Sequence, residues 1–145
     1  MNRILVGVDT SDESVRALQQ AVEQARAHNA ALEVLYVFAP PEQMSAFPVP
    51  PPAPADIEQR RQEYTDRLGA WLDNLDVDLS GLDVTWSVIA DRRPSRALVE
   101  RSAHADLVVV AARGRGGFKG LKLGGVTEQV TRHAKAPVLV VRHNA

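Results

Sequence analysis

Residues 106–142, DLVVVAARGRGGFKGLKLGGVTEQVTRHAKAPVLVVR, hold the clearest structural pattern in the chain. Leu107–Ala111 is a continuous apolar run with the length and valine content typical of a strand that is buried on both faces. Six of the chain's nine glycines follow it, at positions 114, 116, 117, 120, 124 and 125. A helical pattern comes next, and Pro137 ends it before a second apolar run, Val138–Val141. We therefore predict a strand, a glycine-rich loop, a helix and a second, parallel strand.

A glycine-rich loop between a buried strand and a helix is a place where phosphate groups bind. Backbone N–H groups and the positive end of the helix dipole converge there. The sequence contains no Gly-x-x-x-x-Gly-Lys-Ser/Thr, so a P-loop is excluded. Lys119 occupies the third glycine position of a dinucleotide fingerprint that would begin at Gly114, so that fingerprint fails as well. From spacing alone, a phosphate site and a plain surface loop are both open.

Similar patterns before this stretch predict three further strands and three further helices. The strands are Ile4–Val8, Ala31–Phe38 and Val84–Ile89, and the helices run from the turn at residues 9–14 to Asn29, from Asp56 to about Leu75, and from Pro94 onward. At the first helix, Thr10 and Glu13 fit a capping box. This alternation predicts an α/β fold with a five-stranded, mostly parallel open sheet and helices on both faces.

The length and composition of the chain limit what it can be. Its 145 residues suffice for one well-packed domain, predicted over residues 1–145, and are too few for two. The proline-rich residues 40–55 are predicted to be a loop within it. A net charge of -1 gives no case for nucleic acid or an anionic membrane as partner, and the absence of cysteine excludes disulfides. No signal peptide or membrane span is evident, so we expect a cytoplasmic protein.

Several segments closely resemble the universal stress protein family. They are Arg-Gly-Arg-Gly-Gly-Phe, Leu-Gly-Gly-Val-Thr-Glu-Gln-Val and Ala-Pro-Val-Leu-Val-Val-Arg near the C-terminus, and Arg-Ile-Leu-Val-Gly-Val-Asp-Thr-Ser-Asp-Glu-Ser at the start. The resemblance covers essentially the whole chain in the right order. It implies the strand order 3-2-1-4-5, with the strand Val138–Val141 at one edge. It also implies a homodimer formed through that strand, and protein partners that the sequence does not identify.

The resemblance also implies a nucleotide site, with two departures from the family pattern. Members that bind ATP carry Gly-x2-Gly-x9-Gly-Ser/Thr, and the matching positions here are Ala111, Gly114, Gly124 and Gly125. The methyl group of Ala111 would add strain of roughly 1 to 2 kcal/mol if that position required a positive φ. Gly125 lacks the family's hydroxyl, a loss of about 0.5 to 1.5 kcal/mol for one hydrogen bond. We therefore expect nucleotide binding that is weakened but not abolished.

The expected ligand is ATP or another adenine nucleotide, with or without Mg²⁺. Asp9 matches a family position beside the adenosine, and Val37 matches one whose backbone meets the adenine edge. From its place in the sequence alone, Asp9 could equally cap the following turn. The predicted site residues are Asp9, Val37, Ala111, Arg113, Gly114, Arg115, Gly124, Gly125, Val126 and Thr127.

No catalytic machinery is evident in the sequence. The four histidines fall at predicted helix ends or in the tail, without the spacing of a metal set or a nucleophile triad. We expect no enzyme beyond slow, incidental ATP hydrolysis. Two functions remain open: a regulatory module of the stress response that binds adenine nucleotide, and a nucleotide-free dimeric stress protein that acts through protein contacts.

Overall fold

Strands and helices alternate along the chain, as the sequence predicts. The computed structural model describes residues 1–40, 53–113 and 123–142. The elements are β1 (Arg3–Val8), α1 (Asp12–His28), β2 (Ala31–Phe38), α2 (Pro54–Asn74), β3 (Val84–Ala90), α3 (Pro94–Ser102), β4 (Leu107–Ala111), α4 (Gly125–His133) and β5 (Val138–Val141). The strand bounds match the predicted ones to within one residue. Residues 41–52 of the predicted proline-rich loop lie outside the described residues.

The five strands form one parallel sheet in the order β3-β2-β1-β4-β5, which confirms the predicted fold class. β1 lies at the centre, where Ile4 pairs with Leu32 of β2 on one side and with Leu107 of β4 on the other. The connections from β1 and β4 therefore leave in opposite directions. Such a switch point opens a crevice at the carboxyl ends of the two strands.

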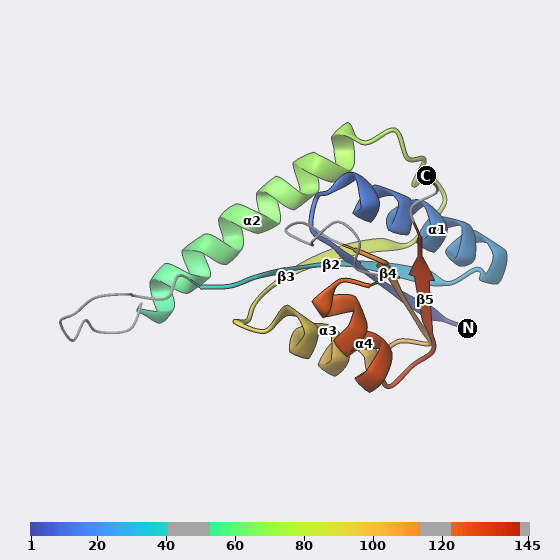
Figure 1. Ribbon diagram of the computed structural model, residues 1–145. Helices are drawn as coiled ribbons and strands as arrows, with labels where there is room; N and C mark the ends of the chain where they lie inside the picture. The colour runs from blue at the N-terminus through green and yellow to red at the C-terminus, as the bar shows by residue number, and fades with distance from the viewer. Residues whose placement is uncertain (41–52, 114–122, 143–145) are drawn as a thin grey trace.

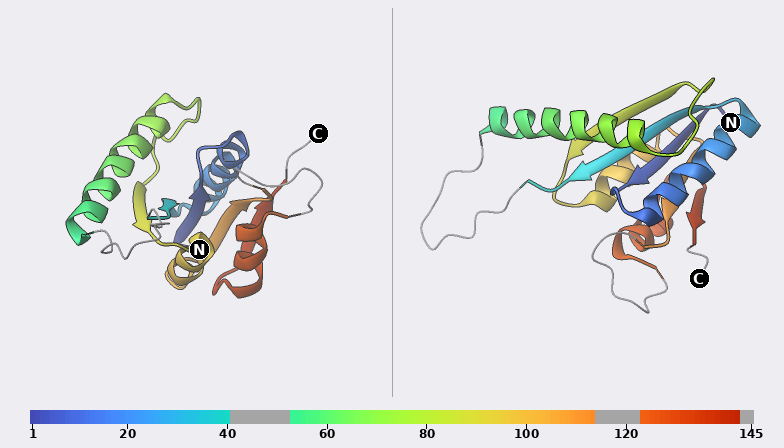
Figure 2. Two further views of the ribbon diagram at one scale, coloured as in Figure 1. Left: turned by 60° about the vertical axis from the view of Figure 1, so that its left-hand side comes forward. Right: turned by 90° about the horizontal axis from the view of Figure 1, so that it is seen from above.

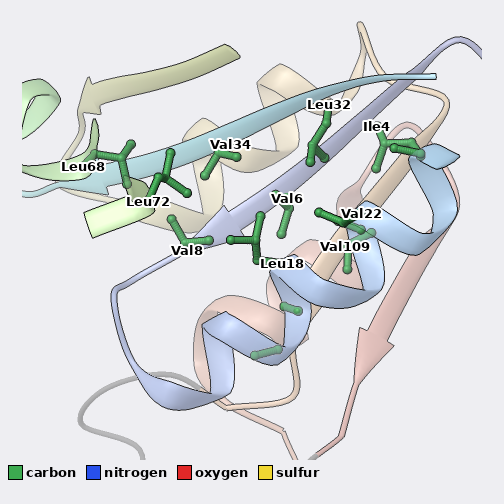
Figure 3. Packing of buried hydrophobic residues seen from close by; sticks show 14 of the residues in the cluster. Ile4, Val6, Val8, Leu18, Val22, Leu32, Val34, Leu68, Leu72 and Val109 are labelled. Carbon is green, nitrogen blue, oxygen red and sulfur yellow. The ribbon is translucent and has the colours of Figure 1, made fainter. Parts of the chain in front are cut away.

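Two helices cover each face of the sheet. α1 and α2 lie on one face and α3 and α4 on the other (Figures 1 and 2). The side chains of β1 alternate between the two layers: Ile4 and Val6 pack toward α1, and Leu5 packs toward α3. Figure 3 shows Leu18 and Val22 of α1 among the side chains of the central strands. All five residues of β4 are buried, as expected for a strand covered on both faces.

The N-cap of α1 is Ser11, one residue after the predicted cap Thr10. The Ser11 hydroxyl accepts the Ser14 N–H at 3.2 Å, and the backbone of Ser11 is extended, with φ -75° and ψ 163°. Thr10 instead has φ 65°. The predicted capping box of Thr10 and Glu13 is therefore wrong, because an N-cap residue needs the extended backbone that Ser11 has. At the other end, Asn29 closes the helix in the left-handed conformation, as predicted.

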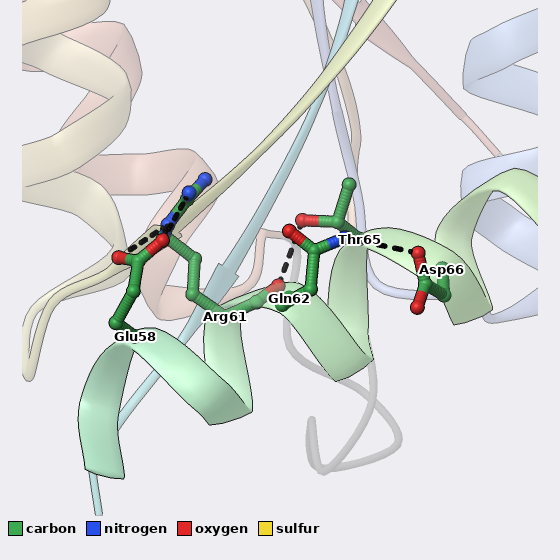
Figure 4. A network of polar contacts seen from close by, with 5 residues as sticks. All are labelled: Glu58, Arg61, Gln62, Thr65 and Asp66. Carbon is green, nitrogen blue, oxygen red and sulfur yellow. Dashed lines mark hydrogen bonds and ion pairs between the residues drawn. The ribbon is translucent and has the colours of Figure 1, made fainter. Parts of the chain in front are cut away.

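The helix α2 begins at Pro54, two residues before the predicted start, because proline suits the first position of a helix. One face of α2 is apolar: Leu68 and Leu72 are buried, and Ile57, Tyr64 and Trp71 pack partly buried against the same core. The opposite face carries polar pairs, including Arg61 with Glu58 (Figure 4). These side chains are exposed, so the pairs contribute little to stability.

The edge strand β5 keeps a partly exposed surface. Each of its four residues is half-buried in the single chain. The carbonyls of Pro137 and Val141 accept N–H groups from Val108 and Ala112, at 2.9 and 2.8 Å. Backbone groups alternate in direction along a strand, so the N–H and C=O groups of Val138 and Val140 point away from β4. The outer edge of β5 is thus a row of backbone groups beside a valine-rich surface.

Candidate functional site

A cleft of about 510 Å³ opens at the carboxyl ends of β1, β2 and β4, at the switch point of the sheet. The starts of α3 and α4 form part of its wall. Its lining residues are Gly7, Val8, Asp9, Ser14, Leu35, Tyr36, Val37, Pro94, Leu98, Val110, Ala111, Arg113, Gly124, Gly125, Val126 and Thr127. The cleft therefore lies where an open parallel sheet is expected to bind ligands.

The structure brings together every predicted site residue that it describes. Asp9, Val37, Ala111, Arg113, Gly124, Gly125, Val126 and Thr127 all line this cleft. The other two, Gly114 and Arg115, lie outside the described residues. These residues lie together at one cleft, and the binding of a ligand by them stays a prediction.

The apolar floor of the cleft was not predicted from the sequence. Leu35, Val110 and Leu98 are buried in the hydrophobic layer beneath α3 and α4. A Cβ atom at Gly7 would lie 3.0 Å from Cδ2 of Leu98, so the glycine allows α3 to pack close to β1. The period of two along a strand puts Leu35 on the same face as Val37, and that signal was available in the sequence. Leu98 and Gly7 become part of the site only through the packing of α3.

Asp9 both lines the cleft and supports the start of α1. Its Oδ1 accepts the Ser11 N–H at 3.0 Å and also the Ser11 hydroxyl. The Ser11 oxygen in turn accepts the N–H of Ser14. The carboxylate thus fixes the turn that caps the helix while it stays at the cleft wall. Asp9 therefore has the turn-capping role that its place in the sequence allowed. Its position at the cleft wall also allows contact with a ligand.

Thr10 is strained, and this predicts a stabilising substitution. A β-branched residue at φ 65° costs about 1 to 2 kcal/mol, and glycine avoids that cost but loses about 0.5 to 1 kcal/mol in chain entropy. We expect Thr10→Gly to raise the free energy of unfolding by up to about 1 kcal/mol in urea denaturation. Asn29→Gly, at the other left-handed position, should gain less because asparagine tolerates that conformation. A loss of stability in Thr10→Gly would contradict the strain argument.

The start of α4 presents backbone N–H groups at the cleft wall. Glu128 N–H makes the first bond of the helix, to the Gly124 carbonyl at 2.9 Å. The N–H groups of Gly125, Val126 and Thr127 precede that bond, in the part of a helix where donors have no intrahelical acceptor. The Thr127 hydroxyl donates a hydrogen bond to the Ala111 carbonyl, with 2.6 Å between the two oxygens. A ligand in the cleft would therefore meet the N–H groups of this turn rather than a hydroxyl proton of Thr127.

The two departures from the family pattern differ in their structural consequences. Ala111 lies within β4, and its side chain belongs to the core layer beneath α1. Among the described non-glycine residues, only Thr10 and Asn29 have a positive φ. The strain considered for Ala111 therefore does not arise. A Cβ atom at Gly125 would meet nothing within 4 Å. Gly125 therefore lacks the family's hydroxyl, but the space for a side chain that carries one is open.

Charged groups occur on the wall and near it. Arg113 is half-buried and lines the cleft. Just before α3, the Asp91 carboxylate accepts hydrogen bonds from the guanidinium of Arg96 and the backbone N–H of Arg93, at 2.7 and 2.9 Å. The hydrogen bond from Arg96 is the main reason that the pKa of Asp91 lies below its usual value. Asp91 is therefore ionised at neutral pH, and its hydrogen bonds stabilise this turn.

Within residues 1–40, 53–113 and 123–142, no group of three His, Asp or Glu side chains is placed to hold a metal ion. No helix in the same ranges is long and apolar enough to span a bilayer. The described part of the cleft combines backbone donors, one arginine, one carboxylate and an apolar floor. That combination is suited to binding a small ligand with a flat apolar part and an anionic part.

Comparison with solved structures gives close matches in fold. The universal stress protein UspA from Lactobacillus plantarum superposes with a TM-score of 0.68 at 24% identity, over 97% of both chains. A universal stress protein crystallised in complex with cAMP superposes with a TM-score of 0.59 at 30% identity, over 97% of this chain and 95% of the other.

Comparison with known sequences places the chain in a family. Universal stress protein Rv2623 of Mycobacterium tuberculosis is 36% identical over 141 residues, which cover 97% of this chain and 45% of the relative. Rv2005c of the same organism is 33% identical over 144 residues, with the same coverage. The chain thus spans about half the length of these curated relatives. The sequence profile of the universal stress protein family matches residues 1–142. The chain belongs to the universal stress protein family.

Proposed function

We propose that this protein is a regulatory module that binds an adenine nucleotide in the cleft between β1 and β4. The main support for the proposal is the grouping of eight predicted site residues, from four separate segments of the chain, around one cleft. Residues from separate segments meet in this way at ligand-binding clefts. A cleft at the switch point is the usual ligand site of an open parallel sheet.

The chemistry of the wall suits the parts of a nucleotide. The apolar floor of Leu35, Val110 and Leu98 offers a surface for the base. The N–H groups at the start of α4 and the positive end of the helix dipole favour a phosphate. Arg113 adds a cation on the same wall. The cAMP complex of a relative at 30% identity supports an adenine nucleotide as the ligand class.

Calorimetry on nucleotide-stripped protein tests this proposal. ATP, AMP and cAMP would each be titrated with and without Mg²⁺, and mass spectrometry would identify any nucleotide that co-purifies. We expect saturable binding tighter than about 1 mM, which corresponds to a binding free energy of about -4 kcal/mol. No heat with any of the three at millimolar concentration, together with no co-purified nucleotide, would refute the proposal. The nucleotide-free dimer would then be the better account.

Restoring the missing hydroxyl should strengthen binding. Gly125→Ser places an O–H beside the N–H groups of α4, in a space where its Cβ meets nothing within 4 Å. One added hydrogen bond to phosphate is worth about 0.5 to 1.5 kcal/mol, so we expect AMP and ATP to bind about two- to tenfold more tightly. Gly125→Ala is the matched control, because it adds the Cβ without the hydroxyl. An equal gain in both variants would show that the hydroxyl is not responsible.

We also propose that the protein forms a homodimer through the outer edge of β5, where Val138 and Val140 direct backbone groups away from β4. Light scattering should give about twice the chain mass of 15.8 kDa. Val140→Pro removes an outward N–H but keeps the ladder to β4, so it should yield a monomer. Val84→Pro is the control at the opposite edge of the sheet and should remain dimeric. A monomeric wild type, or a dimer that survives Val140→Pro, would refute this interface.

A further inference from the structure

Two hydrogen bonds join the start of α4 to the last residue of β4 and to the residue that follows it. The Thr127 hydroxyl donates to the Ala111 carbonyl at 2.6 Å, and the Gly124 N–H donates to the Ala112 carbonyl at 2.7 Å. One bond holds the residue before the helix and the other holds its first turn. Two points of attachment fix both the position and the direction of the helix start relative to the sheet.

The bond of Thr127 differs from those of other threonines in helices. Thr131, in the same helix, donates to the Glu128 carbonyl, and Thr65 donates to the Arg61 carbonyl. Those bonds stay within one turn of the residue's own helix, which is the common pattern for a helical threonine. Thr127 instead reaches a strand residue 16 positions earlier in the sequence, and it is 5% exposed. Its hydroxyl therefore makes a tertiary contact that its own helix does not provide.

We propose that Thr127 is a positioning residue, which holds the N–H groups of Gly125 and Val126 toward the phosphate of a bound nucleotide by anchoring α4 to the Ala111 carbonyl. This inference rests on the proposed function for the identity of the ligand. Thr127 itself does not need to touch the phosphate, since its side chain is buried and its hydroxyl donates its hydrogen bond to the Ala111 carbonyl of β4. Pre-organised donors bind an anion more tightly because they need not be ordered when it arrives.

The test compares three variants with two probes. Thr127→Val keeps the shape of the side chain and removes the hydroxyl, Thr127→Ser keeps the hydroxyl, and Thr131→Val makes the same exchange on the exposed side of the same helix. The probes are AMP and adenosine, which differ only in the phosphate. We expect Thr127→Val to bind AMP about five- to tenfold more weakly and adenosine unchanged. Thr127→Ser and Thr131→Val should bind both probes like the wild type.

A measurement without ligand decides the positioning role separately. We expect the N–H of Glu128, which makes the first bond of α4, to exchange with solvent about tenfold faster in Thr127→Val and unchanged in Thr131→Val. Unchanged exchange would overturn the inference, and so would AMP binding that is unaffected or adenosine binding that falls equally. If the wild type binds neither probe, the proposed function fails, and hydrogen exchange alone then decides whether Thr127 holds the helix.

Discussion

Asp9→Ala is expected to weaken the binding of an adenine nucleotide by about ten- to a hundredfold. Asp9 is the carboxylate on the described wall of the cleft, at the end of the central strand β1. A hydrogen bond between a carboxylate and a ribose hydroxyl is worth about 1.5 to 3 kcal/mol, and each 1.4 kcal/mol changes affinity tenfold. The measurement is calorimetry with AMP and ATP, on wild type and variant at the same salt concentration.

The structural role of Asp9 has to be separated from its role in binding. Alanine also removes the acceptor of the Ser11 N–H and hydroxyl, so the turn before α1 should lose about 1 kcal/mol of stability. Asp9→Asn retains an oxygen for the Ser11 N–H, and it replaces the other carboxylate oxygen with an NH2 group, so the charge and one acceptor are lost. We expect asparagine to restore thermal stability but not affinity. Wild-type affinity in both variants would show that Asp9 acts as a turn cap alone.

The fold could be predicted because parallel strands leave a strong signal. β4 is buried along its whole length, so its sequence is a continuous apolar run. Asn29 is the C-cap of α1, whereas α4 ends at His133, before the predicted stop at Pro137. The cap of α1 could not be predicted as well. Thr10 and Ser11 are both suitable cap residues by type, and only the backbone conformation, left-handed at one and extended at the other, distinguishes them.

The site was predictable where it depends on strand ends and not where it depends on packing. Asp9 and the start of α4 follow strands, so their place at one edge of the sheet follows from topology. Leu98 is an ordinary apolar residue in the sequence, and it lines the cleft only because Gly7 lets α3 approach β1. The hydrogen-bond acceptor of Thr127 could not be predicted from the sequence either, because a helical threonine can donate to a carbonyl of its own helix, as Thr131 does.

Leu18→Ala is expected to lower the free energy of unfolding by about 3 kcal/mol. Leu18 is fully buried on α1, among side chains of β1 and β4 (Figure 3). Replacing a buried leucine by alanine costs about 2 to 5 kcal/mol, since the apolar contacts are lost and a cavity remains. Domains of this size are stable by about 5 to 15 kcal/mol, so the variant should still fold. Urea denaturation followed by circular dichroism measures the change.

The control is Gln19→Ala, at the next position of the same helix but exposed, which should change stability by less than about 0.5 kcal/mol. Leu18 does not line the cleft, so its variant should keep the nucleotide affinity of the wild type at temperatures where it is folded. A ligand stabilises the folded state by an amount set only by its concentration and Kd. The stabilisation by AMP should therefore be equal in Leu18→Ala and wild type, and smaller in Asp9→Ala. A smaller stabilisation in Leu18→Ala would mean that the core beneath α1 also shapes the cleft.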